Sequence, residues 1–172
     1  MKKIFTVLML AASSAPLLAT DYTNQLVVNM NGIEIANQQA VISVEQKDNG
    51  NYILKLDNFC IGTTMPVGNI VVDDVTNMGN SDTPILITNQ NINITPGTLE
   101  GVGESDWMGP LLGSVPVEVK AEIRGEELYS LIDISMPGMA ISVQFGNGGY
   151  QIGNSGFENF HTATAGSATS DE

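Results

Sequence analysis

The chain has 172 residues, of which 42% are hydrophobic and 15% charged, and six basic residues against nineteen acidic ones give a formal net charge of -13. This length allows one domain with at most an appendage, and the apolar fraction is too high for a disordered acidic chain. The charge excludes nucleic acid as a main partner, because phosphate is recognised by clustered Lys and Arg, and it disfavours docking on an anionic membrane.

The first twenty residues, MKKIFTVLMLAASSAPLLAT, predict a secretory signal peptide over residues 1–20. Two lysines precede the apolar run Ile4 to Leu10, which is followed by small residues and Pro16. The apolar run is too short for a membrane span. We expect cleavage after Ala19 and export to the periplasm, the cell surface or the medium. The exported chain then keeps four basic residues against nineteen acidic ones, a charge of -15.

Beyond the signal, period-two segments separated by Gly, Asn, Asp and Pro predict eight short strands. Their expected ranges are Asn24–Met30, Ala40–Lys47, Asn51–Phe59, Gly68–Val75, Ile85–Thr95, Val115–Arg124, Glu127–Met136 and Met139–Phe145. Adjacent strand residues point to opposite faces, so Asp73 and Asp74 are expected on opposite sides of the fourth strand. The sixth strand alternates most clearly, with Val115, Val117 and Val119 on one face and Glu118 and Lys120 on the other.

Eight antiparallel strands joined mostly by tight turns predict an all-β fold, an eight-stranded up-and-down barrel over residues 21–149. A two-sheet sandwich is the competing topology. The sixth strand places charges outward and apolar residues inward, which is the reverse of a membrane barrel, so no membrane insertion is expected.

The segment from Pro96 to Ser114 is the longest irregular stretch, and it holds the only Trp. Trp107 and Met108 are interpreted either as a lid over a ligand cavity or, for Trp107, as a plug of one barrel end. Glu104 and Asp106 are expected to be solvated, because no EF-hand spacing surrounds them. No metal and no cofactor are therefore predicted.

Catalytic motifs are missing from the sequence. It contains no HExxH, GxSxG or CxxC, and its one Cys, Cys60, lies far along the chain from its one His, His161. A single Cys cannot form an internal disulfide, so the domain depends on its apolar core. A non-enzymatic protein is expected.

Three runs resemble a known family: MPVGNIVVDDV from Met65, WMGPLLGSVPVEV from Trp107 and LYSLIDISM from Leu128. They are similar to the calycin-like β-barrel domain of secreted bacterial proteins, over Asp21 to about Gly149. The resemblance implies a lipocalin-type barrel. True lipocalins have Gly-x-Trp near the first strand, which this chain lacks, so their retinoid and haem ligands are not implied.

Residues 150–172 form a tail with two interpretations. Gly156 to Phe160 resembles the opening strand of a carbohydrate-metabolism domain that often follows this barrel, which would make the tail the start of a second domain. The composition of Ala165 to Ser170 favours a flexible terminus instead.

The barrel predicts a small apolar or amphipathic ligand, with an entrance formed by Trp107, Met108 and Met65 and further contacts from Tyr52 and Tyr129. The alternative is a structural spacer at the cell surface, associated with a carbohydrate-directed neighbour. A glycan partner on the row Asn89, Asn91 and Asn93 is a third hypothesis, against a solvated strand face.

Overall fold

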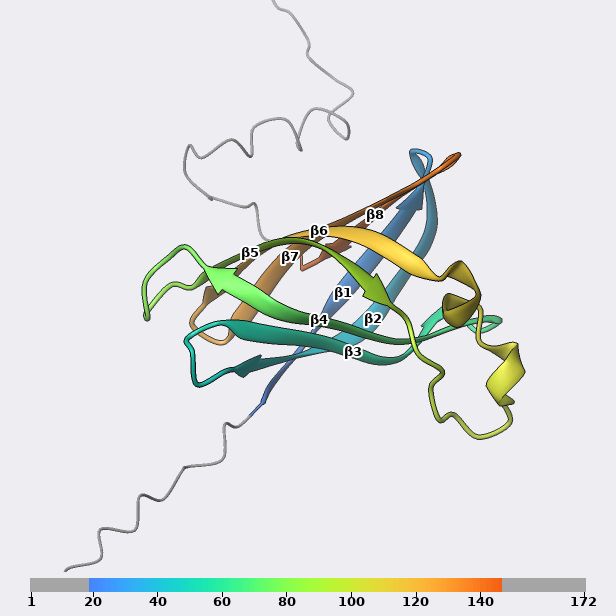
Figure 1. Ribbon diagram of the computed structural model, residues 1–172, viewed down its shortest axis with the longest axis horizontal. Coiled ribbons are helices and arrows are strands. Elements are labelled where there is room, and N and C mark those ends of the chain that lie inside the picture. Colours follow the sequence, from blue (N-terminus) through green and yellow to red (C-terminus); the bar gives the residue numbers. More distant parts are fainter. Residues whose placement is uncertain (1–18, 147–172) are drawn as a thin grey trace, which may run out of the picture.

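The computed structural model describes residues 19–146, which form a closed barrel of eight antiparallel strands in chain order (Figure 1). The strands are β1 Thr20–Met30, β2 Ile33–Gln46, β3 Tyr52–Ile61, β4 Met65–Asn77, β5 Ile85–Asn93, β6 Ser114–Arg124, β7 Glu127–Met136 and β8 Met139–Phe145. Each pairs with the next, and β8 pairs with β1. The predicted up-and-down barrel is confirmed. The expected signal segment, except its last two residues, and the tail from residue 150 lie outside the described residues.

The bounds of β7 and β8 coincide with the prediction, whereas β2 begins well before the expected Ala40. Its first half, Ile33 to Gln39, pairs with the Gln25–Met30 part of β1. This half lies at a barrel rim where both faces are largely exposed, so its side chains show no apolar alternation. Backbone pairing with β1, which leaves no mark in the sequence pattern, extends the strand here.

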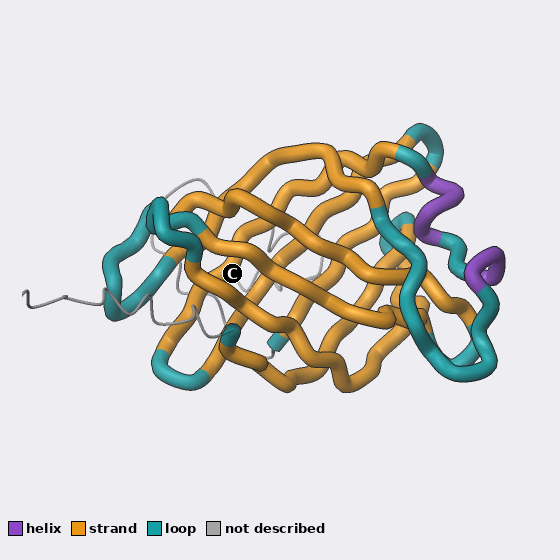
Figure 2. The backbone as a smooth tube through the Cα atoms, turned by 60° about the horizontal axis from the view of Figure 1, so that its bottom comes forward, coloured by secondary structure: helices purple, strands orange, loops and turns teal. Residues whose placement is uncertain are grey.

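Successive connections alternate between the two ends of the barrel, which we call the open end and the closed end (Figures 1 and 2). The open end carries the β1–β2, β3–β4, β5–β6 and β7–β8 connections, including two 3-10 turns, η1 (Glu104–Asp106) and η2 (Gly109–Leu112). The closed end carries the other three connections. At the open end, Asn31 and Gly32 both have positive φ angles (49° and 83°), as a two-residue hairpin turn requires. In the described part of the chain, no helix is long and apolar enough to cross a membrane.

The period-two pattern of β6 sorts its side chains as predicted. Val115, Val117 and Val119 are buried inside the barrel, while Glu118 and Lys120 lie on the outer face and form an ion pair (3.0 Å). Glu122 is the exception, because its outward side chain is only 5% exposed. Its Oε1 accepts a hydrogen bond from Arg124 Nε, which compensates part of the cost of burying a carboxylate.

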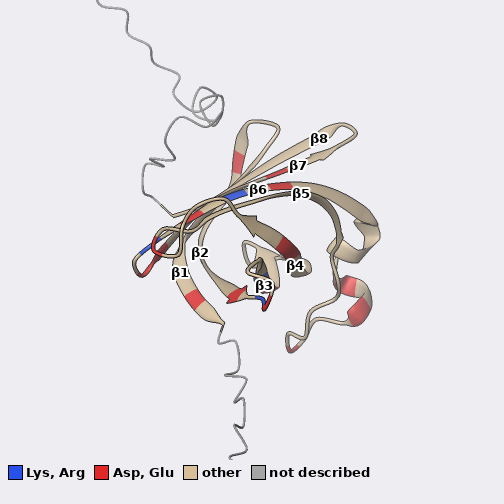
Figure 3. Ribbon diagram, turned by 60° about the vertical axis from the view of Figure 1, so that its left-hand side comes forward, with Lys and Arg blue, Asp and Glu red and all other residues tan. Residues whose placement is uncertain are grey.

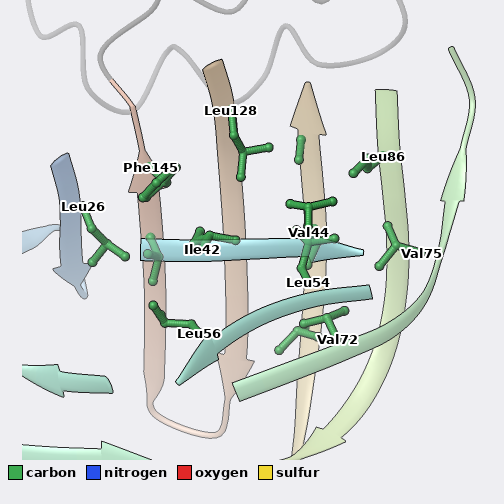
Figure 4. Close-up of a cluster of buried hydrophobic side chains, with 14 of the residues drawn as sticks. Leu26, Ile42, Val44, Leu54, Leu56, Val72, Val75, Leu86, Leu128 and Phe145 are labelled. Atoms are coloured by element: carbon green, nitrogen blue, oxygen red, sulfur yellow. The ribbon is translucent and has the colours of Figure 1, made fainter. Parts of the chain in front are cut away.

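The closed-end half of the barrel is filled with side chains. Leu26, Val75, Leu86, Leu128 and Phe145 come from five different strands and are almost completely buried, and Figure 4 shows them within one cluster of buried side chains. This packing makes the closed-end half a conventional hydrophobic core.

A β-bulge in β4 overturns the expectation for Asp73 and Asp74. The pairing of β4 with β3 shifts register between Val72 and Val75, and Asp74 has a positive φ of 57°. Both carboxylates consequently contact Lys47, with Oδ1–Nζ distances of 3.0 and 3.6 Å. Two adjacent strand residues therefore lie on the same side, since the extra residue of a bulge interrupts the alternation.

Candidate ligand-binding site

The open-end half of the barrel contains a cavity of about 170 Å³. Its walls come from all eight strands and from η2, including Val28 of β1, Ile42 of β2, Ile132 of β7 and Val143 of β8. The fully buried core residues Leu26, Leu86 and Phe145 are absent from its walls. The lumen is thus packed at one end and hollow at the other.

The cavity wall is almost purely apolar. Apart from Gly109 and Lys55, every residue that lines it has a hydrophobic side chain. The volume is below the roughly 300 Å³ at which pockets for drug-sized ligands begin, and close to the roughly 150 Å³ of an apolar cavity that admits benzene. The chemistry and the size of this space fit a slender hydrocarbon group.

Methionines surround the open end of the cavity. Of the six methionines among residues 19–146, five line it: Met30, Met65, Met108, Met136 and Met139. Met65 and Met108 are 37% and 46% exposed, while the other three are partly buried. The unbranched thioether side chain changes rotamer easily and fits irregular apolar shapes. We call these five side chains the methionine ring.

The turn η2 holds one side of the ring in place. The Met108 N–H donates a hydrogen bond to the Pro66 carbonyl oxygen (2.9 Å), which ties the β5–β6 connection to β4. Gly109 follows directly, and a Cβ atom there would lie 2.2 Å from Ile94 Cγ2 and 2.4 Å from the Val67 oxygen. Only glycine allows this approach. Beside it, Leu111 is 81% exposed, so the rim around the ring is also apolar.

Lys55 is the one charged residue in the cavity wall. Its Nζ lies 3.2 Å from Glu45 Oε2, and the two side chains are partly exposed. Its strand neighbours Leu54 and Leu56 are buried inside the barrel, so the Lys55 side chain points outward and its ammonium group pairs with Glu45 on the outer face.

The structure brings two of the five predicted site residues, Met65 and Met108, to the cavity. Trp107 is 1% exposed but lies outside the cavity wall and outside the core cluster. Trp107 belongs to the β5–β6 connection and packs against Gly97 of the same connection, where an added Cβ would lie 2.6 Å from its ring. The structure thus buries Trp107 within the connection that carries Met108, and Trp107 does not line this cavity.

The two predicted tyrosines also lie away from the cavity. Tyr52 is at the closed end, where it borders a separate polar hollow of about 420 Å³ lined by Asn49, Asn51 and Asn80. Tyr129 is on β7, whose pairing turns it outward, and its hydroxyl donates a hydrogen bond to Glu127, which raises the pKa of the tyrosine. Both tyrosines were expected as further ligand contacts, and neither lines this cavity.

Sequence reasoning missed Met30, Met136 and Met139. Each flanks a tight turn, Asn31–Gly32 or Pro137–Gly138, and both turns lie at the same end of the barrel. In an up-and-down barrel alternate connections share an end, so methionines beside the first and seventh turns are brought together. This alternation of connections is the sequence-readable rule from which Met30, Met136 and Met139 could have been predicted at one end of the barrel.

The other candidate residues predicted from the sequence do not line this cavity. Asn89, Asn91 and Asn93 are exposed on the outer face of β5. Asp106 accepts a hydrogen bond from the Gly103 N–H (2.9 Å) within its own loop. Among residues 19–146, no group of three or more His, Cys, Asp or Glu side chains is placed to hold a metal ion.

Comparison with known proteins identifies the family. The Calycin-like beta-barrel domain matches residues 18–148, which covers all eight strands. No curated protein and no solved structure matches the chain significantly. The family match and the closed eight-stranded barrel agree, and the chain belongs to the calycin-like β-barrel domain family.

Proposed function

We propose that this domain is an exported, non-enzymatic binding protein that holds a small apolar or amphipathic ligand in the open-end half of its barrel. The observation that carries the proposal is the cavity of about 170 Å³, walled by apolar side chains and bordered by the methionine ring. Export is supported by the signal-like pattern of residues 1–20.

Burial of apolar surface supplies the binding energy in this proposal. Each Å² of apolar surface removed from water contributes about 25 cal/mol, and a preformed cavity needs little reorganisation. The wall offers few polar groups to orient a substrate, and its one titratable side chain, Lys55, is paired with Glu45. This arrangement supports binding more than it supports chemistry.

Methionine methyl NMR tests the proposal directly, with 1-octanol as the probe. We expect the five methyl signals of the methionine ring to shift on titration. Met78 is exposed in the β4–β5 connection at the closed end and serves as an internal control, because it does not line the cavity. Uniform small shifts at all methionines, or none, would count against binding in the lumen and favour the spacer alternative.

A cavity-filling variant provides the second test. Ile132 lines the cavity, whereas its neighbour Leu131 does not and is turned outward by the strand alternation. Ile132→Phe is expected to weaken octanol binding about tenfold or more by occupying the space, and Leu131→Phe is expected to leave it within about twofold. Equal affinities for the two variants would contradict the assignment.

A further inference from the structure

We propose that the ligand is a single-chain amphiphile without a negative charge, whose hydrocarbon chain enters the cavity and whose neutral or cationic head remains at the methionine ring. This inference rests on the proposed function. It adds the charge class and the shape of the ligand.

The first argument is that no cation is left to hold an anionic head. In the described part of the chain there are four basic side chains, and each forms an ion pair with a carboxylate. The pairs are Lys47 with Asp73 and Asp74, Lys55 with Glu45, Lys120 with Glu118, and Arg124 with Glu122. Figure 3 shows the few basic segments among more numerous acidic ones.

Among these four, only Lys55 borders the cavity, and it does so from a strand position whose side chain points outward to Glu45 (3.2 Å). An anionic head in the cavity would therefore meet no cationic partner among the described residues. The negative electrostatic field of the protein, whose net charge is -13, would also repel an anionic head. A hydroxyl or ammonium head meets neither cost.

The second argument is the division between lumen and rim. The walls of the cavity are apolar apart from Lys55 and Gly109, so a polar head inside would lose its hydration without a partner. The head therefore stays at the open end, where Met65, Met108 and Leu112 are exposed enough to cover the first part of the chain. A volume of about 170 Å³ accommodates one slender chain rather than two.

Three probes with the same chain and different heads test the charge class: 1-octanol, octanoate and octyltrimethylammonium, each below its micelle concentration. Methionine methyl NMR reports binding at the ring. We expect octanol and octyltrimethylammonium to bind, and octanoate to bind about tenfold more weakly than octanol. Octanoate binding as tightly as octanol, or more tightly, would overturn the inference while leaving the proposed function intact. Failure of all three to shift the ring signals would overturn both.

Two matched variants test whether Lys55 can reach a bound head. Glu45→Gln removes the carboxylate that pairs with Lys55, and Glu118→Gln removes the carboxylate that pairs with Lys120, both on the outer face. Ion pairs on the outer face contribute little to stability, so both variants are expected to fold. Because Lys55 points away from the lumen, both variants should leave octanoate and octanol binding within about twofold of the wild type. Octanoate binding that tightens about tenfold in Glu45→Gln alone would show that a cation can face the cavity, and would overturn the first argument.

Discussion

Asp133 on β7 shows how a single carboxylate on the outer face is affected by its cross-strand neighbours. Burial raises its pKa above the ordinary 3.8, and the nearby charge of Glu118 adds to the effect. A hydrogen bond from Ser142 and the charge of Lys120 act in the opposite direction. The folded protein therefore binds a proton at Asp133 more readily than the unfolded chain, and ionisation of Asp133 lowers stability as the pH rises.

Asp133→Asn is expected to stabilise the protein modestly at about pH 7, because the variant never carries the unfavourable charge. Its advantage should shrink as the pH falls through the raised folded-state pKa, and it should vanish below 3.8, where the wild-type carboxyl is protonated in both states. Urea unfolding at about pH 7 and about pH 3 measures this difference. Asp82→Asn removes the same charge from the exposed β4–β5 connection. A benefit of equal size and pH dependence in both variants would contradict the local origin.

Gly97 makes room for Trp107. A Cβ at this position would lie 2.3 Å from Asn58 Oδ1 and 2.6 Å from the indole ring. Gly97→Ala is expected to cost about 1–3 kcal/mol of unfolding free energy through overpacking, and to change the fluorescence of Trp107. Gly103→Ala, in the same connection but with its nearest contact at 3.0 Å from a side-chain oxygen of Asp106, is the control. Similar losses in both variants would refute this account of Gly97.

Among the elements, the β3–β4 hairpin is attached least firmly to its neighbours. β2 pairs with β3 only over Ser43–Gln46, and β4 pairs with β5 only at Thr76 and Asn77 and through the bridge of Asn69 with Thr95. Side-chain amides span both seams. Across β2–β3, Gln38 donates to the Cys60 carbonyl (2.7 Å) and accepts from the Gly62 N–H (2.8 Å). Across β4–β5, Gln90 donates to the Asp73 carbonyl.

The sparse pairing of the β3–β4 hairpin with β2 and β5 predicts faster amide hydrogen exchange in β3 and β4 than in β6 and β7, whose registers are continuous. Gln38→Ala should accelerate exchange at the open-end half of β3 further, because it removes both hydrogen bonds across the seam. Gln144→Ala, on the well-paired strand β8, is the control. Uniform protection around the barrel would show that the hydrogen-bond ladder does not set local stability here.

At the scale of the whole molecule, one half of the barrel provides stability and the other provides space. Leu128 is completely enclosed at the closed end, whereas Ile134 on the same strand faces the cavity. Leu128→Ala is expected to cost about 2–5 kcal/mol, because it opens a new void. Ile134→Ala should cost at least about 1 kcal/mol less, because it only enlarges an existing space. Chemical denaturation of both variants measures the difference, and equal costs would argue that the lumen is packed evenly.

The local alternation of apolar and polar residues was sufficient to predict a strand wherever that strand has one buried and one exposed face. The alternation of Val115, Val117 and Val119 with charged residues predicted β6, and the flanking turn residues set the bounds of β7 and β8. It failed at the rim half of β2 and at the bulge of Asp73 and Asp74, where pairing geometry rather than side-chain polarity decides the conformation. For the site, the long segment before β6 predicted Met108 and Trp107 together, and only Met108 lines the cavity, since burial of an aromatic does not reveal which surface it is buried against.

By itself, the sequence determined the class of the fold and the number of its strands, because period-two hydrophobicity and turn dipeptides are local properties. Only the tertiary structure decided that the lumen is filled at one end and hollow at the other, and that five methionines distant in sequence meet at the hollow end. Closure and register bring these residues together. Both are long-range properties that no single segment of the chain encodes.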